Sequence, residues 1–449
     1  MKISMKAART AISALLATGA TLAFAGPSAD EIAKLGSELT PVGAERAANK
    51  DGTIPAWDGG LKGNAPADAG KGYPDPYAAD KPLFTITAAN AAQYAEKLSA
   101  GHLELLKRQP GYKIVVYPTR RSGAYPQAIY DAVKAEAPKV ETTGGGNGIT
   151  GVMRSTVPFP IPKSGVEVLW NHMVRFRGGA LTRSQTQFPV HLNGSFTPVT
   201  RVETVAWASS MPNPEPNRLL YYYTTLTGPS SMAGESNILH AFLDQVKEPN
   251  QVWAYNPGQR RVLRAPDLSH DAPQIGADGL ATIDDYDGFF APTDRFNWKL
   301  VGKKEMIISY NNFKLNDKAL KYTDIVRPAH LNQDLVRYEL HRVWVVEATV
   351  KPGARHIYAK RMFYFDEDTW QFAHADQFDG RGELWRVHEM HAVPYYDIPM
   401  MWAACDVVYD LQARRYIVFG LTNQEKPIRI GVKVTPADFT VDSLRRAGH

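Results

Sequence analysis

The stretch RGELWRVHEMHAVPYYDIP places two histidines and a glutamate close together, at His388, Glu389 and His391. A zinc site of the zincin type needs H-E-x-x-H on a helix, because histidines four residues apart lie on one helical face. Here the histidines are three apart, and the aromatic and β-branched residues around them indicate a strand. Side chains alternate between the two faces of a strand, so His388 and His391 should point to opposite sides. We therefore predict ordinary strand histidines and no metal at this place.

Other residues that could support catalysis form no recognisable motif. Asp284, Asp285 and Asp287 lack the spacing of an EF-hand loop and are typical of a turn. The chain has no G-x-S-x-G elbow and no Walker A loop, and its GGGNG run does not match a dinucleotide-binding fingerprint. Some histidines of the C-terminal third could still meet in space, although the sequence shows no chelating pair among His341, His356, His374, His388 and His391. We predict no catalytic residue, no cofactor and no enzymatic activity.

A basic cluster follows a tight turn at Pro257 and Gly258, for which a type II turn with positive φ at the glycine is expected. In a strand, Arg260 and Arg264 share one face and Arg261 lies opposite. The arginines could contact an anionic head group or an acidic partner. They could equally pair with the acidic run at 284–287, since surface charge pairs are common.

The first residues have the form of a secretory signal peptide. Lys2, Lys6 and Arg9 precede a short apolar run, and a small-x-small motif ends at Ala25. We predict that residues 1–25 are removed after Ala25 and that the mature protein is exported, which in a Gram-negative cell means to the periplasm. No cysteine follows the run to carry a lipid, and no later stretch is apolar for the roughly 18 residues that a transmembrane helix needs.

Composition excludes further classes of protein. The formal net charge of +5 becomes +2 once the three basic residues of the signal peptide are lost, which argues against nucleic-acid binding. The one cysteine, Cys405, stands in an apolar run and is typical of a buried core residue. Without disulfides, the fold must depend on a hydrophobic core, and 449 residues are enough to build one.

Residues 26–163 are predicted to be an N-terminal extension of helices and irregular chain that packs on the core. Ser28 and Glu31 form a capping box for a short helix. A second helix is expected from Thr87 as its N-cap, and YKIVVYP should be a short strand. Glycine and proline dominate the rest, including a flexible loop at ETTGGGNGITG.

The pattern changes at residue 164, where Ser164 and Glu167 form another capping box. One apolar helical face follows, made of Val166, Leu169, Trp170, Met173 and Val174. This face could pack into a core or line a ligand cavity. Mostly β segments come next, joined by short turns, which indicates an antiparallel meander. They are TPVTRVETVAWAS, NRLLYYYTTLT, QVWAYNPGQRRVLRA, WKLVGKKEMIISY, VRYELHRVWVVEATV, HIYAKRMFYFDEDTW and RYIVFGLT.

The segment from Val336 to Val350 predicts a strand with two unlike faces. The even-numbered residues, which share one face, are apolar except for Arg342. The odd-numbered residues on the other face are mostly polar and include Glu339 and His341. A sheet with one apolar face must cover it with helices or a second sheet, or leave part of it for a hydrophobic ligand.

Along nearly the whole mature chain, the sequence resembles a long periplasmic family catalogued as a domain of unknown function and described as outer-membrane lipoprotein-sorting-like. The resemblance rests on LTPVGAERAANKDGTIPAWDGG, VPFPIPKSGVEVLWNH, VWAYNPGQRRVLRAP and RYELHRVWVVEATVKPGARHIYAKRMFYFDEDTW. The segment 251–390 is also similar to the LolA/LolB-type lipoprotein carriers, through Trp253, Tyr255, Pro257, the arginines that follow, Tyr358, Lys360, Asp366, Asp376 and Gly380. The carriers lack a counterpart of residues 26–163.

This resemblance implies an α+β, mainly β fold at 164–449, in which a curved antiparallel sheet forms a half-barrel over helices with an apolar cavity between them. It implies a carrier of a lipid, a lipoprotein acyl chain or another hydrophobic molecule. It also suggests an inner-membrane exporter of the resistance–nodulation–division type and an outer-membrane protein as partners. The alternative is a non-catalytic envelope adaptor whose proline-rich N-terminal part binds another chain.

Two groups of site residues follow from the predicted helix and strands. We expect the cavity to be lined by Trp170, Met173, Trp207, Tyr222, Trp253, Tyr338 and Trp344. We expect head-group or partner contacts from Arg260, Arg264 and Arg342.

Overall fold

The computed structural model describes residues 26–64, 72–152, 154, 156–265 and 270–447. The predicted signal peptide, residues 1–25, lies outside the described residues. Among the residues that are described, none of the helices combines the length and the apolar run needed to cross a bilayer.

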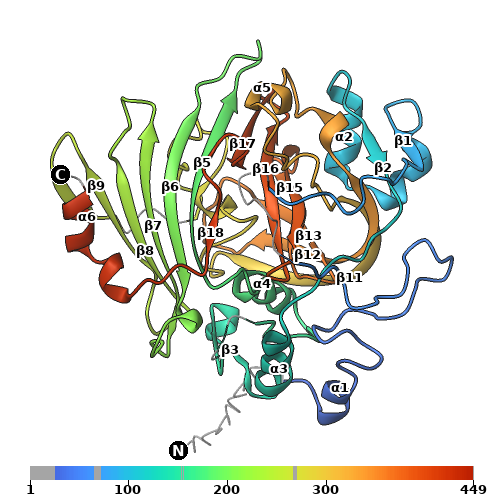
Figure 1. Ribbon diagram of the computed structural model, residues 1–449, viewed down its shortest axis with the longest axis horizontal. Coiled ribbons are helices and arrows are strands. Elements are labelled where there is room, and N and C mark those ends of the chain that lie inside the picture. The colour runs from blue at the N-terminus through green and yellow to red at the C-terminus, as the bar shows by residue number, and fades with distance from the viewer. Residues whose placement is uncertain (1–25, 65–71, 153, 155, 266–269, 448–449) are drawn as a thin grey trace, which may run out of the picture.

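One large curved sheet of 16 strands organises the chain (Figure 1). Its order is β1-β2-β12-β13-β14-β15-β16-β17-β5-β6-β7-β8-β9-β10, with β11 beside β12 and β18 beside β5. The strand pairs are antiparallel, and the contact between β2 and β12 is a parallel bridge from Val116 to Tyr338. The predicted fold class, α+β and mainly β with a curved antiparallel sheet, is confirmed.

The strands of this sheet come from both the extension and the C-terminal part. They are β1 (Phe84–Ile86), β2 (Ile114–Val116), β5 (Ala180–Val190), β6 (Val199–Trp207), β7 (Arg218–Gly228), β8 (Ser236–Phe242), β9 (Gln251–Asn256), β10 (Arg261–Arg264), β11 (Phe296–Ser309), β12 (Tyr338–Val350), β13 (Lys360–Asp366), β14 (Phe372–Phe378), β15 (Leu384–Tyr395), β16 (Met400–Asp410), β17 (Arg415–Leu421) and β18 (Arg429–Ile430). The sequence analysis did not predict β1, β5, β8, β14, β16 or β18.

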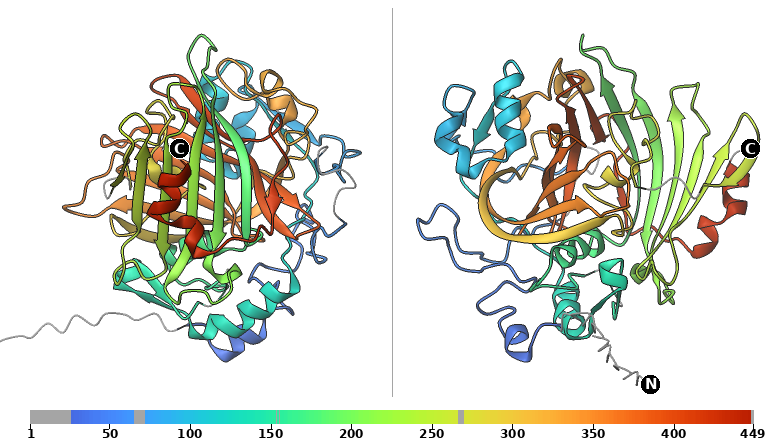
Figure 2. Two further views of the ribbon diagram at one scale, coloured as in Figure 1. Left: turned by 60° about the vertical axis from the view of Figure 1, so that its left-hand side comes forward. Right: turned by 180° about the vertical axis from the view of Figure 1, so that it is seen from behind.

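The curvature brings two halves of the sheet face to face. In Figures 1 and 2, β5–β9 form one side and β12–β17 the other. The helix α4 (Gly165–Val174) lies at the base between them and shares one apolar core with both halves. The C-terminal helix α6 (Val441–Ala447) packs against β8, β9 and β10 from the outside. The remaining helices are α1 (Ala29–Ala33), α2 (Ala100–Arg108), α3 (Gln127–Glu136) and α5 (Tyr322–Ile325).

Helix α4 begins where the capping pattern predicts. The Ser164 side chain accepts a hydrogen bond from the Glu167 backbone N–H, which satisfies one of the free donors of the first turn. The prediction of a single apolar face was too narrow, because all ten residues of α4 are buried. Trp170 donates its indole N–H to the Gly146 carbonyl at 2.9 Å. This hydrogen bond joins α4 to the N-terminal extension.

The extension contains the predicted capping box at Ser28 and Glu31. The single helix expected from Thr87 is wrong: a 3₁₀ helix, η2 (Ala91–Lys97), and α2 are separated at Leu98, which has extended φ/ψ. Ser99 caps α2 instead, accepting from the His102 N–H, because serine is a much better N-cap than the alanines around it. Helix α2 packs on β14 and β15.

Two predicted loops differ from the structure. The segment ETTGGGNGITG is a small hairpin of β3 (Glu141–Thr143) and β4 (Gly148–Thr150), whose turn has glycines with positive φ. In the hairpin of β9 and β10, the residue with positive φ is Arg260 (51°) and not Gly258. Because Asn256 pairs with Arg261, four residues form this turn, and the expected type II geometry at the glycine is wrong.

Strand β12 is buried along both of its faces over most of its length. The polar parity of this strand holds an ion-pair network. Glu339 accepts a hydrogen bond from the Arg120 backbone N–H at 2.7 Å and from His341 at 3.0 Å. Arg120 belongs to the N-terminal extension, so the extension covers part of the polar face of β12.

Candidate functional site

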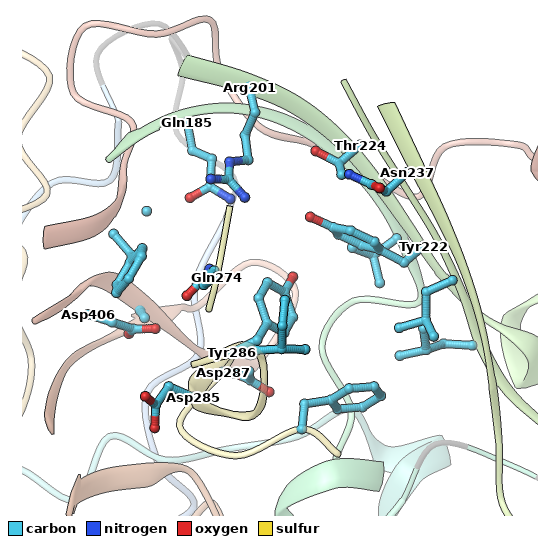
Figure 3. Close-up of a pocket in the computed structure, with 18 of the residues that line it drawn as sticks. Gln185, Arg201, Tyr222, Thr224, Asn237, Gln274, Asp285, Tyr286, Asp287 and Asp406 are labelled. Atoms are coloured by element: carbon cyan, nitrogen blue, oxygen red, sulfur yellow. The ribbon is translucent and has the colours of Figure 1, made fainter. Parts of the chain in front are cut away.

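A cavity of about 220 Å³ lies on the concave side of the sheet (Figure 3). Strands β5–β9 form its outer wall, and residues from β16 and β17 line the opposite part. The segment 274–292, which includes the 3₁₀ helix η6 (Ile283–Asp285), lies across it. The apolar part of the wall is made of alternate residues on neighbouring strands, among them Val205, Leu220, Leu226, Leu239 and Val252.

The polar end of the cavity is formed by β5 and β6. Gln185 and Arg201 are directly paired residues on these strands, and in Figure 3 both side chains extend into the pocket. Arg201 is 7% exposed and donates hydrogen bonds to the Gln187 side chain and the Ile275 carbonyl. Within the described part of the chain, no carboxylate lies at ion-pair distance from Arg201. A buried guanidinium without an anion beside it favours an anionic ligand group.

The neighbouring carboxylate, Glu203, is already fully engaged. It accepts hydrogen bonds from Arg183, from Gln185 at 2.8 Å and from Tyr222 at 2.8 Å. Burial alone would raise the pKa of Glu203, but the charges of Arg183 and Arg201 and the hydrogen bonds from Arg183 and Tyr222 together outweigh it, and the pKa is lowered. Glu203 is therefore ionised and forms its ion pair with Arg183, while the charge of Arg201 acts on it from beyond ion-pair distance.

Aromatic rings hold two further arginines against the cavity wall. The guanidinium of Arg177 lies 4.7 Å from the ring centre of Trp207, and that of Arg183 lies 5.1 Å from the ring centre of Trp402. Such cation–π contacts orient the charged groups while the ring faces stay apolar. The cavity thus combines an apolar wall with fixed positive charge.

Buried ion pairs form the floor of the cavity. Asp287 accepts from Arg175 at 2.9 Å and also binds Arg177, so two cations share one carboxylate. Asp284 and Asp285 belong to a second network: Asp284 contacts Arg361 at 2.7 Å, and Asp285 accepts from the Tyr358 hydroxyl at 3.1 Å. The suggested pairing of this acidic run with the arginines at 260–264 is therefore wrong, because the run is buried and its partners lie on other elements.

Asp406 on β16 also faces the cavity (Figure 3). Its Oδ1 atom is buried and has no hydrogen-bond partner among the residues described. Burial raises the pKa of Asp406 to about 7, although the charges of Arg183 and Arg175 act in the opposite direction. Near neutral pH a large fraction of this carboxyl is protonated, so it adds little negative charge to the cavity.

This raised pKa predicts a pH-dependent effect of the Asp406→Asn substitution. Between pH 4 and 7 the unfolded chain is ionised at this position while the folded chain keeps the proton, so the wild type loses stability as pH rises, by up to about 1.4 kcal/mol per pH unit. Asparagine does not titrate, so at this position it adds no pH-dependent contribution to the free energy of unfolding. We expect Asp406→Asn to gain roughly 2–4 kcal/mol over the wild type between pH 4 and pH 8. Urea unfolding of both proteins at the two pH values measures it; a pH-independent difference would contradict the raised pKa.

The structure places the predicted cavity residues in several different environments. Trp207 and Tyr222 line the cavity. Trp170 and Met173 are buried in the core around α4, Trp253 packs against His240 and the C-terminal helix region, and Trp344 stacks on Trp370 with 6.0 Å between ring centres. Tyr338 lies under α2, where its hydroxyl donates to Glu389 at 3.1 Å. The expected position on this cavity does not hold for Trp170, Met173, Trp253, Tyr338 and Trp344. Trp170, Met173 and Tyr338 are buried, and Trp253 and Trp344 are half-buried against the hydrophobic core.

The predicted head-group arginines also lie away from the cavity. Arg342 is buried and donates to the Ala47 carbonyl at 2.9 Å, so it attaches the extension to β12. Arg260 and Arg264 are exposed on the hairpin of β9 and β10. They do not line the pocket, and a contact with an external partner remains a proposal for them.

Several lining residues were missed by the sequence analysis. Arg183, Gln185 and Gln187 occupy alternate positions of β5, a strand that the sequence analysis did not predict. Their period of two in RSQTQF was the available signal. Arg175 and Arg177 follow α4, and nothing local indicates that they face a cavity.

His388 and His391 lie on the two sides of β15. His388 contacts the ring of Phe372 (4.8 Å between centres), whereas His391 hydrogen-bonds to Ser309 through Nδ1 at 2.7 Å. The prediction that they point apart is confirmed. Cys405 is buried, as expected.

Comparisons with known proteins give one family model and one curated relative that cover most of the chain. The model of a family described as "Protein of unknown function (DUF1329)" matches residues 85–445. "Uncharacterized protein PA3922" of Pseudomonas aeruginosa is 49% identical over 436 residues, which are 96% of each chain.

Among solved structures, a putative outer membrane lipoprotein-sorting protein domain from Vibrio parahaemolyticus matches with a TM-score of 0.42 and 14% identity, covering 63% of this chain and 98% of its own. A DUF1329 family protein from Desulfovibrio piger matches with a TM-score of 0.42 and 13% identity, covering 60% and 92%.

Proposed function

This chain belongs to the DUF1329 family of proteins of unknown function, and we propose that it is a periplasmic binding protein that carries a hydrophobic ligand with an anionic end. The observation that carries the proposal is the cavity, which joins an apolar wall on β6–β9 to the buried guanidinium of Arg201. The proposed periplasmic location rests on the predicted signal peptide at residues 1–25.

The size of the cavity indicates how much ligand it encloses. A volume of about 220 Å³ lies below the roughly 300–1,000 Å³ of typical small-molecule sites. Each methylene group buried there is worth about 0.8 kcal/mol. A short acyl chain, or the end of a longer one, therefore fits the site.

The charge of the cavity selects among hydrophobic ligands. Glu203 pairs with Arg183, and Asp287 serves both Arg175 and Arg177, so two carboxylates are shared by three arginines and Arg201 has no ion-pair partner among the described residues. A fatty acid carboxylate or a similar anionic group placed beside Arg201 and Gln185 restores the balance. A neutral, purely apolar ligand leaves the guanidinium buried without an anion, which is unfavourable.

The alternative function is a non-catalytic envelope adaptor that partners an exporter or an outer-membrane protein. An adaptor needs no ligand, and side chains should then fill its core completely. The cavity and its unpaired arginine favour the carrier. Transfer to an inner-membrane exporter of the resistance–nodulation–division type, or to an outer-membrane protein, is the step that we propose for release of the ligand.

Native mass spectrometry of the mature protein, purified from its own periplasm, tests the carrier function. We expect a defined excess mass that organic extraction releases as an anionic lipid or fatty acid. The delipidated protein should then bind a fluorescent fatty acid in the micromolar range. A protein that is purified empty and also fails to bind fatty acid or lipid would support the adaptor instead.

A further inference from the structure

A second group of polar side chains, none of which lines the cavity, lies between α2 and the sheet. His102 on α2 contacts Glu389 on β15, with its Nε2 atom 3.0 Å from Oε1. His374 on β14 is the strand partner of Glu389, and its Nε2 lies 2.7 Å from Asp376 Oδ1. All four side chains are at most 2% exposed. The sequence analysis did not connect His102 with the histidines of the C-terminal third.

Two carboxylates in this group have little positive charge near them. Neither Asp376 nor Glu389 contacts a lysine or an arginine within the described part of the chain. Asp376 accepts hydrogen bonds from the Ser99 hydroxyl at 3.1 Å and the Gly101 N–H at 3.0 Å, at the start of α2. Glu389 accepts from Tyr338 at 3.1 Å. Neutral donors satisfy the lone pairs, but buried ionised carboxylates also need a counter-charge.

Protonated histidines do not supply this charge easily. The rings of His102 and His374 have centres 4.3 Å apart, so two imidazolium cations there would repel each other strongly. Even with one of the rings charged, the pair of carboxylates keeps an excess negative charge. A divalent cation balances both carboxylates and allows both rings to be neutral.

We propose that this group binds a divalent transition-metal ion, with zinc as the best fit, through His102, His374 and Glu389. One ligand atom from each of these residues lies within 4.8 Å of the other two. Ligand atoms about 2.1 Å from one ion lie at most about 4.2 Å apart. His102 Nε2 and Glu389 Oε1, at 3.0 Å, are already within this range. Two imidazoles and a carboxylate are the protein ligands of many zinc sites.

An additional buried group is directed at the same place. His391 binds Ser309 through Nδ1, while its Nε2 atom lacks a hydrogen-bond partner among the described residues and lies 3.9 Å from Glu389 Oε2. This leaves His391 in position to complete the coordination or to hydrogen-bond Glu389. The ion would join α2 of the N-terminal extension to β14 and β15, which makes the site structural and independent of the proposed ligand cavity.

Metal analysis of the untagged mature protein, exported from its precursor and purified without chelators, tests this site. We expect about one zinc ion per chain by plasma mass spectrometry. Removing it with a chelator should lower the melting temperature by about 3 °C or more, and added ZnCl₂ should restore it. The variants His102→Gln and Glu389→Gln should lose the metal, while His388→Asn, on the same strand but the opposite side, should keep it.

The proposal is overturned if the wild type contains almost no metal and its melting temperature does not change with Zn²⁺, Mn²⁺ or Co²⁺. It is equally overturned if His102→Gln and Glu389→Gln fold and retain the same metal content as the wild type. Where a variant does not fold, the visible spectrum of the Co²⁺-loaded wild type provides a second measurement, because a buried four-coordinate site gives much more intense d–d bands than six-coordinate cobalt on the surface. Binding of fatty acid by the metal-free protein separates this result from the function of the cavity.

Discussion

Replacing Arg201 with methionine is expected to weaken the binding of a fatty acid by about 10- to 100-fold. A hydrogen bond to a charged group contributes about 1.5–3 kcal/mol, and each 1.4 kcal/mol is a factor of ten in affinity. Methionine keeps much of the apolar stem of the side chain but removes the guanidinium that faces the cavity. Titration of the delipidated protein with a fluorescent fatty acid measures the loss.

The comparison variant for this experiment is Arg264→Met. Arg264 is exposed on β10 and does not line the cavity, so its loss should leave the affinity unchanged. A neutral ligand of the same chain length, such as the corresponding alcohol, should bind the wild type and the Arg201→Met variant about equally. Equal fatty acid affinities for wild type and Arg201→Met would show that the carboxylate does not lie at this end of the cavity.

Replacing Arg361 with methionine is expected to destabilise the fold by about 3–5 kcal/mol, because it leaves a buried carboxylate without its cation. Arg361 on β13 is fully buried and donates to Asp284 at 2.7 Å. Its guanidinium also lies 4.6 Å from the ring centre of Tyr358 and 5.3 Å from that of Phe296. This network supports η6, which forms part of the cavity, so the substitution should also weaken ligand binding.

The double variant Arg361→Met with Asp284→Asn should recover part of the lost stability, because both buried charges are then absent. The control is Arg381→Met, which removes an exposed arginine paired with Asp379 and should have no measurable effect. Urea unfolding of the four proteins measures the free energies. A double variant that is less stable than Arg361→Met alone would contradict the charge argument and assign the effect to lost packing.

Much of the fold could be predicted because its signals are local. Ser164 followed by Glu167 determines where α4 begins, since a cap needs only the residues of one turn. The alternating parity of residues 336–350 is a property of consecutive residues, and β12 occupies that segment as predicted. Even the helix that failed, from Thr87, broke at Ser99 for a local reason that the sequence contained.

The candidate sites depended on contacts between distant segments. Trp207 and Trp344 both stand on strands, yet Trp207 lines the cavity and Trp344 stacks on Trp370. The alternation of side chains along a strand determines on which side each residue lies, but it does not determine which other residues pack on that side. Only the curvature of the sheet and the path of segment 274–292 determine which inward residues remain uncovered.

The motif of His388, Glu389 and His391 also separates what the sequence determines from what only the tertiary structure determines. The sequence determined that His388 and His391 point to opposite sides of β15, because neighbouring positions in a strand alternate. Only the tertiary structure placed His102, 287 residues before Glu389, against that carboxylate. Sequence spacing describes geometry within one element, whereas a site built from α2, β14 and β15 exists only after packing has brought the elements together. The tertiary structure also determines that Arg201 has no carboxylate beside it. Which charged groups surround a buried guanidinium depends on residues from distant parts of the chain, and their positions cannot be read from the order of the sequence.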